Sequence, residues 1–347
     1  TQVNQIPLKF SSNIKPGHGQ LIDVEFNANH AYLNNNQHQA LTRASLFIAY
    51  QKLKLFRHLS IKTTLQKEFS NLFELPLTTG LVLNYDFKKQ LQFYVTMHNA
   101  YRMPTLNELY YFPGGNISLK PEKSRNIEGG LLSNVTHFRY NLHSNLSGYA
   151  RKVKDWITWY GNAILTPHNI QEVRNYGIEY SLDFRYQPFK IRDTNTHDLE
   201  IIVADRTSHA KANATSFNAG ILYSYNISTT TSSAIPNDYS IGKQIPYVPR
   251  YQFKLNLGFN YKAFDIQLIH TYTGYRFVTT DESQFLKPYQ TTNLLSSINL
   301  HTKGQLIKLT GQVNNLLNNQ YESIVGRTMP GRYFTLGLTW QYQHESL

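Results

Sequence analysis

The stretch YQFKLNLGFNYKAF, residues 251–264, alternates apolar and polar side chains with a period of two. One set is Tyr251, Phe253, Leu255, Leu257, Phe259 and Tyr261, and the other is Gln252, Lys254, Asn256, Gly258, Asn260 and Lys262. Successive side chains of a β-strand point to opposite faces. The alternation therefore predicts a strand with one apolar face and one wet face.

The same alternation recurs along the whole chain. Further clear examples are residues 21–32, 77–87, 91–101, 176–187 and 333–342. We expect about fourteen such strands, and we expect few helices because the helical spacing of apolar residues fails throughout. The predicted fold class is all-β and antiparallel.

Two kinds of connection separate the predicted strands. The tight ones are residues 86–90, 261–265 and 301–305, and the long ones, rich in Asn, Thr, Ser, Pro and Gly, are residues 104–123, 161–171, 228–249 and 278–288. Because short and long connections alternate along the chain, we expect all the long ones at one end of the sheet.

A soluble β-sandwich and a transmembrane β-barrel both produce alternation this regular. In a sandwich the apolar face is the core, whereas in a barrel it contacts lipid and the polar face lines a wet lumen. Predicted strands of ten or more residues favour the barrel, since strands in soluble sheets average about five or six. Aromatic residues at the ends of the apolar rows and charged residues within the polar rows favour it as well.

Composition narrows the function. The 347 residues include no cysteine, which excludes disulfides and cysteine-based metal or thiol chemistry. Lys and Arg number 34 against 22 Asp and Glu, and the net charge of +12 favours anions such as lipopolysaccharide phosphates or an acidic ligand. No aromatic–basic motif indicates nucleic acid. Neither an enzyme, a cofactor nor a metal site is predicted, because catalytic motifs and metal-binding histidine spacing do not occur.

Two motifs follow the predicted strand at residues 91–101. YRMPTLNELYY, residues 101–111, contains the pattern aromatic-Arg-x-Pro-Thr-x-x-Glu-Leu-Tyr, and residues 116–124 contain Asn-x-x-Leu-x-Pro-Glu-x-Ser. Together they resemble the C-terminal barrel half of TonB-dependent outer-membrane receptors. The matching residues are Tyr101, Arg102, Pro104, Thr105, Glu108, Leu109, Tyr110, Asn116, Leu119, Pro121, Glu122, Ser124 and Glu128.

Two later segments extend the resemblance. IPYVPRYQFKLNLGF, residues 245–259, is similar to the Pro-x-x-Pro-(Arg/Lys) start of a late strand in that family. The last segment of the chain is similar to the family's closing elements through Asn315, Leu316, Asn318, Tyr321, Pro330, Gly331, Arg332 and the amphipathic stretch at residues 333–342. Three elements in the right order over about 250 residues are far more specific than any one alone.

The resemblance implies a 22-stranded barrel with an N-terminal plug, energised by an inner-membrane TonB complex. Residues 1–347 are expected to form the C-terminal portion of the barrel, because they contain no plug-like segment and no TonB box. The implied function is uptake of a siderophore–iron, cobalamin-like or haem-like nutrient across the outer membrane of a Gram-negative bacterium. The alternative is a plugless passive or adhesive barrel. Expected partners are the TonB complex, lipopolysaccharide, outer-membrane lipid, a small-molecule ligand and a surface lipoprotein. The positive net charge of the chain favours an anionic ligand.

Candidate ligand contacts lie in one long connection and at a Trp-rich strand end beside another. Tyr110, Tyr111 and Phe112 form an aromatic tip, and Trp156 and Trp159 in DWITWYGNAILTPHN, residues 155–169, offer a platform for a flat ligand. Arg102 is a further candidate. The competing interpretation is architectural: Arg102 pairs with Glu108 across the loop base, and the tryptophans belong to an interface girdle. No histidine lies between residues 104 and 116, which disfavours haem.

Overall fold

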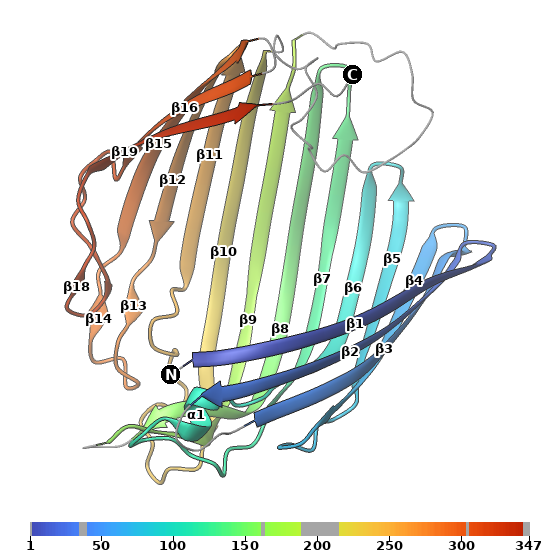
Figure 1. Cartoon of the computed structure of the whole chain (residues 1–347), viewed down its shortest axis with the longest axis vertical. Helices are drawn as coiled ribbons and strands as arrows, with labels where there is room; N and C mark the ends of the chain where they lie inside the picture. The colour runs from blue at the N-terminus through green and yellow to red at the C-terminus, as the bar shows by residue number, and fades with distance from the viewer. Residues whose placement is uncertain (1, 35–39, 161–163, 189–214, 303–304, 343–347) are drawn as a thin grey trace.

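A computed structural model of the protein describes residues 2–34, 40–160, 164–188, 215–302 and 305–342. Within these residues, fifteen antiparallel strands pair edge to edge in one large sheet (Figure 1). In spatial order they are β1 (Gln2–Gly17), β2 (Gln20–Asn34), β3 (Ala40–Phe56), β4 (Leu59–Ser70), β5 (Thr78–Lys88), β6 (Leu91–Arg102), β7 (Glu122–Thr136), β8 (Tyr140–Tyr160), β9 (Thr166–Tyr186), β10 (Ser216–Ser233), β11 (Tyr251–Tyr261), β12 (Phe264–Thr273), β15 (Tyr289–Thr302), β16 (Gln305–Asn314) and β19 (Tyr333–Tyr342). The all-β antiparallel prediction is confirmed, with one strand more than the fourteen expected.

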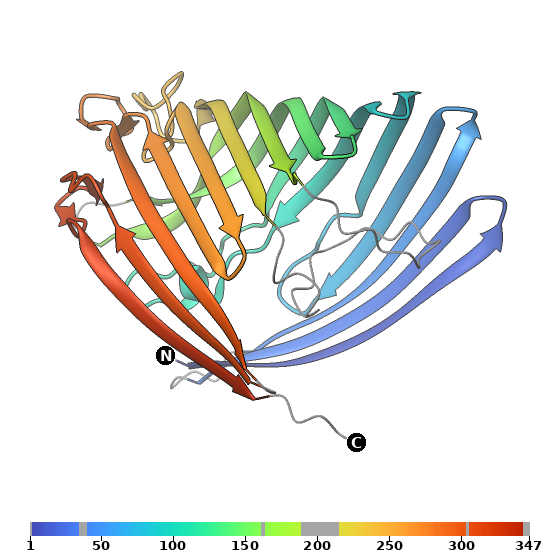
Figure 2. The same cartoon turned by 90° about the horizontal axis from the view of Figure 1, so that it is seen from above.

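The sheet bends strongly across its width. Figure 2 shows a wall that curves round from β1 at one edge to β19 at the other, with the loop that carries the short helix inside the curve. Spatial order follows chain order throughout, so each strand pairs with its sequence neighbours in the sheet. This up-and-down order is the arrangement of a transmembrane barrel wall.

Register aligns the apolar rows across the sheet. Leu257 on β11 lies opposite Ala219 on β10 and Leu268 on β12, so one apolar position continues into the next strand. A longer row runs through Phe93, Leu131, Leu146, Tyr180, Tyr223, Phe253 and Tyr272 on seven successive strands. A slip of one residue would move a whole strand's apolar set to the other face.

These apolar rows are exposed. Leu131, Ile178 and Phe259, for example, expose 41%, 51% and 46% of their surfaces. Among the described residues only ten apolar side chains other than proline are buried, and no second sheet packs on the large one. A soluble sandwich would bury such rows between two sheets, so the structure favours the barrel.

The connections divide largely as the sequence predicts. Tight turns lie at one end, and at the other lie α1 (Leu106–Tyr110) and the small ribbons β13–β14 (Arg276–Phe277 and Phe285–Leu286) and β17–β18 (Glu322–Ile324 and Arg327–Thr328) (Figure 1). The four predicted long connections lie at the α1 end of the sheet, as expected. Two of their predicted bounds are wrong, because residues 166–171 belong to β9 and residues 228–233 belong to β10.

Helical structure contributes little to this fold. Within the described residues α1 is the only helix, and it has five residues. No helix in this part of the chain is long and apolar enough to cross a membrane.

Replacing Leu257 by Arg should place a charge in the middle of the apolar face and lower the free energy of unfolding by about 2–4 kcal/mol. Gln267→Arg on β12 is the matched control, because Gln267 lies on the polar face beside the same apolar row. Urea unfolding of the full-length protein folded into lipid vesicles measures both variants. Equal losses would contradict the assignment of the two faces.

Candidate functional site

Helix α1 begins with a capping box that its local sequence dictates. Thr105 takes an extended conformation, and its hydroxyl accepts the backbone N–H of Glu108 at 3.1 Å. The Glu108 carboxylate in turn accepts the backbone N–H of Thr105 at 2.7 Å. These reciprocal bonds satisfy N–H groups that a helix start otherwise leaves unpaired. The Thr-x-x-Glu spacing therefore gives a very short helix a defined start.

Arg102 ties this helix to the sheet. Its guanidinium contacts Glu108 at 3.0 Å and Glu122 at 2.6 Å, and Glu122 lies opposite Arg102 in the β6–β7 ladder. Glu122 is 6% exposed and also accepts the backbone N–H of Ile157 on β8 at 2.9 Å. The expected pairing of Arg102 with Glu108 is present, and the guanidinium holds the loop to two strands.

Electrostatics keeps Glu108 ionised. Burial raises the pKa of its carboxyl, but hydrogen bonds from Arg102 and from Thr105 outweigh this cost, so the pKa lies below its ordinary value. Hydrogen bonding to the charged form of a carboxyl has this effect in general.

Apolar contacts fix the other side of the loop. Leu106 packs against Leu41 of β3, and Leu109 packs against Leu119 and Ile157. Tyr110 is half-buried against both groups. The loop thus spans from β6 across to β3 and β8, on the polar side of the sheet. Of the three predicted tip aromatics, Tyr110 therefore has a packing role.

The remaining tip residues lie at the rim. The ring of Tyr111 meets that of Trp159 edge to face, with centroids 6.2 Å apart, and Phe112 is 91% exposed. We call Tyr111, Phe112 and Trp159 the rim patch. Trp156 and Trp159 lie on opposite faces of β8. Ile157 and Trp159 are two residues apart and therefore share a face, whereas Trp156 directly precedes Ile157 and points to the other side.

Close backbone contact positions this patch. Gly114 lies so near the Leu165 carbonyl that a Cβ there would be 2.2 Å from the oxygen. The side-chain amide of Asn116 donates to the Pro167 carbonyl at 2.8 Å. The loop between β6 and β7 is therefore docked on the β8–β9 extension. This docking brings together two aromatic groups that lie far apart in the sequence.

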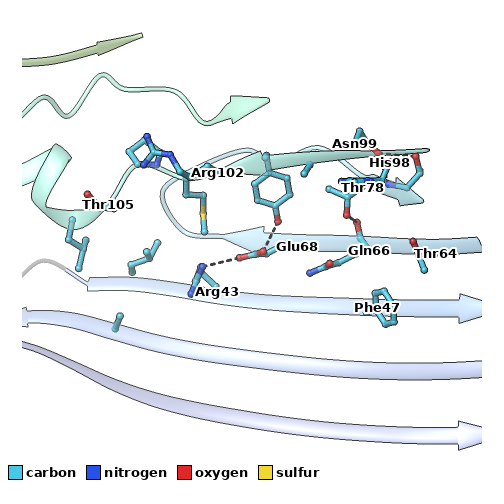
Figure 3. Close-up of a pocket in the computed structure, with 18 of the residues that line it drawn as sticks. Arg43, Phe47, Thr64, Gln66, Glu68, Thr78, His98, Asn99, Arg102 and Thr105 are labelled. Atoms are coloured by element: carbon cyan, nitrogen blue, oxygen red, sulfur yellow. Dashed lines mark hydrogen bonds and ion pairs between the residues drawn. The ribbon is translucent and has the colours of Figure 1, made fainter. Parts of the chain in front are cut away.

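A cavity of about 860 Å³ opens beside the helix start (Figure 3). Its lining includes Arg43, Gln66, Glu68, His98, Tyr101 and Arg102. The Tyr101 hydroxyl donates to Glu68 at 2.5 Å, and the Arg43 guanidinium lies 3.7 Å from the same carboxylate. The cavity offers hydrogen-bond donors and acceptors beside an aromatic ring, a mixture suited to a polar organic ligand.

Sequence reasoning did not single out Arg43 and Glu68 as site residues. They come from β3 and β4, and only the pairing of strands brings them next to β6. The sequence signal that could have pointed to Arg43 and Glu68 is their position on the polar face, near the end of the sheet where the long connections lie. Among the described residues, no group of three or more His, Asp or Glu is placed to hold a metal ion.

Comparisons with known proteins give a consistent result. The family model described as "TonB dependent receptor-like, beta-barrel" matches residues 74–316. The vitamin B12 transporter of Vibrio vulnificus is 32% identical over 93 residues, which cover 26% of this chain and 14% of the transporter. That of Photobacterium profundum is 29% identical over 113 residues, covering 31% and 18%.

Solved structures share the fold. The ferric enterobactin receptor of Pseudomonas aeruginosa superposes with a TM-score of 0.68 at 16% identity, covering 97% of this chain and 53% of the receptor. The ferric yersiniabactin uptake receptor of Yersinia pestis gives 0.63 at 13% identity, covering 99% and 54%. The chain thus spans about half the length of these receptors, and less than a fifth of each transporter aligns with it.

Glu108→Gln should loosen the docked loop, because it removes the charge that Arg102 and the Thr105 N–H contact. We expect a loss of about 1–2 kcal/mol, which corresponds to about tenfold faster amide exchange in residues 105–111. Hydrogen–deuterium exchange with mass spectrometry of the full-length protein measures it. Asn107→Ala, an exposed change on the same helix, is the control. Native-like exchange in Glu108→Gln would contradict the anchoring role.

Acid should release the same loop only at low pH. Because the folded pKa of Glu108 lies below its ordinary 4.5, the contribution of this carboxylate is complete above about pH 4.5. It is lost as the pH falls through the lowered value. A spin label on a cysteine introduced at Asn107 should therefore gain mobility only below pH 4.5. In the Glu108→Gln variant the spin label should be mobile at every pH. Release of the loop well above pH 4.5 in the native protein would contradict titration of Glu108 as the cause.

Proposed function

Because the chain belongs to the TonB-dependent receptor β-barrel family, we propose that it forms part of the wall of an outer-membrane receptor for active nutrient uptake. The observation that carries the proposal is the single curved sheet with an apolar outer face, a polar inner face and a docked loop at one end. Such a wall supports a wet lumen across a membrane. The family is one of transport receptors, and no catalytic group is proposed.

The ligand we propose is a siderophore–iron complex or a cobalamin-like molecule. Support comes from relatives that are named vitamin B12 transporters and from solved neighbours that are ferric siderophore receptors. The net charge of +12 favours an anionic ligand. A haem-like ligand has less support, since no histidine lies between Pro104 and Asn116.

Ligand contact is proposed at two levels. The rim patch meets the ligand first, since exposed aromatic rings bind flat, partly apolar molecules. The cavity beside Arg43 and Tyr101 then offers polar contacts on the inner face. Arg102 lines this cavity and at the same time holds the loop, so its proposed role is to position the site. Tyr110 and Trp156 are proposed as supports of the rim.

Energy and partners complete the proposal. We place the receptor in the outer membrane of a Gram-negative bacterium, with a TonB complex as its energy source and a surface lipoprotein as a further partner. The plugless passive or adhesive barrel remains the other function to test, although none of the relatives and solved structures named above is described in those terms. Planar-bilayer conductance of the full-length protein separates the two, because a large constant pore contradicts a plugged receptor.

Phe112→Ser should weaken ligand binding about tenfold. Truncation of an important aromatic residue at a binding site costs more than about 1 kcal/mol, and about 1.4 kcal/mol corresponds to a tenfold change in affinity. Phe138→Ser is the matched control, since Phe138 is 62% exposed in a tight turn at the other end of the sheet. Cells producing full-length protein would be tested for uptake of labelled vitamin B12 and of a panel of ferric siderophores, with and without a functional TonB complex. Uptake of none of them, or uptake independent of TonB, would overturn the proposal.

A further inference from the structure

Basic side chains gather on one face of three adjacent strands. Arg125 on β7 lies opposite Lys152 on β8, and Lys152 lies opposite Arg174 on β9. Lys123 and Lys154 form a second opposed pair one step further along β7 and β8. These five residues are the basic row. Strands β7–β9 lie in the middle of the sheet, far from either edge strand (Figure 2).

The basic row belongs to the apolar outer face. Two residues away from Arg125, Lys152 and Arg174 on the same strands lie Ile127, Ala150 and Tyr176. These three residues are opposite one another and form the neighbouring row on the same face. Ile127 and Tyr176 are 46% and 47% exposed. Because residues two apart in a strand share a face, the cations border the lipid-contacting rows directly. They do so at the long-connection end, since Lys123 follows the loop that carries α1.

This arrangement is electrostatically unfavourable by itself. Directly opposed residues on neighbouring strands have Cβ atoms about 4.5–5.5 Å apart, and like charges placed so are destabilising. One carboxylate offsets part of the charge, because Glu172 contacts Lys152 at 2.5 Å. In the described part of the chain, no carboxylate forms an ion pair with the other four cations. The ladder therefore holds several positive charges together without enough internal neutralisation.

We propose that the basic row binds the phosphate groups of lipopolysaccharide in the outer leaflet. The proposal rests on the outer-membrane location given in the proposed function. A phosphorylated glycolipid fits because its acyl chains would lie on the Ile127–Tyr176 row while its phosphates reach the cations one row above. Arg125 and Arg174 can each present a planar fork to phosphate oxygens.

The position of the row separates this site from ligand uptake. Strand alternation places Arg125 and Lys152 on the face opposite Glu122 and Arg151, and Glu122 is bound to the loop beside the inner cavity. Arg125 and Lys152 therefore face away from a ligand that lies against Glu122 and Arg151 in the lumen. A lipid on the outside of the wall reaches the row, and it would brace β7–β9, whose extended strands carry Trp159.

The test uses Arg125→Gln combined with Arg174→Gln, which leaves the Lys152–Glu172 pair intact. Arg151→Gln is the control, because Arg151 is an exposed cation on β8, the strand between the two variant positions, and it faces the other side of the sheet. Full-length protein purified in neutral detergent is titrated with purified lipopolysaccharide, with chemically dephosphorylated lipopolysaccharide and with inorganic phosphate. The affinity and the shift in thermal midpoint are measured.

Each basic side chain near an anionic lipid surface is worth a factor of about five, so the double variant should bind lipopolysaccharide about 25-fold more weakly. The native protein and Arg151→Gln should bind alike, and dephosphorylated lipid should bind all three weakly. Unchanged affinity in the double variant would overturn the proposal, as would equal binding of dephosphorylated lipid. A response to inorganic phosphate as strong as that to the lipid would also overturn it, since the site would then be a free-anion site.

Uptake by cells distinguishes this proposal from the transport function. Lipopolysaccharide binding that depends on Arg125 and Arg174 in a protein that transports no nutrient would support the lipid site and reject the transport role. Nutrient uptake by a native protein with no lipopolysaccharide affinity would support the transport role and reject the lipid site.

Discussion

Pairing of backbone hydrogen bonds across neighbouring strands is the constraint on which this structure depends. A sheet with lipid on one side has no water there to satisfy unpaired N–H and C=O groups. Asparagine side chains extend the ladder where strands stop: Asn99 accepts the Thr79 N–H at 2.6 Å and donates to the Leu77 carbonyl at 2.9 Å. Asn169 joins the backbone of Lys120 in the same manner at 2.7 and 2.9 Å. Their amides take the place of missing peptide groups.

The same ladder places charges as firmly as it places apolar rows. On the inner face it sets Arg102 opposite Glu122, a favourable pair from which the helix-bearing loop is held. On the outer face it sets Arg125 opposite Lys152, an unfavourable pair that Glu172 neutralises only in part. One register thus produces an internal anchor on one side and the proposed lipid site on the other.

Prediction from sequence succeeded where the signal was local. Period-two alternation in residues 251–264 identified β11 and its apolar face, and the Arg102–Glu108 pairing followed from the spacing within one loop. It failed for residues 166–171, whose Pro and Asn content predicted a loop, because these residues pair with the extended end of β8. It also did not find Arg43 beside Tyr101, because nothing local relates two residues on strands three apart.

What the sequence determined by itself is the two-faced strand, the family motifs and the Thr105–Glu108 helix start, since each depends on residues a few positions apart. Only the tertiary structure decided that Tyr111 meets Trp159 while Tyr110 turns inward, and that three cations stand in one row across β7–β9. The physical reason is register: the alternation fixes which face a side chain takes within its strand. The hydrogen-bonded pairing of whole strands fixes which distant side chain stands next to it.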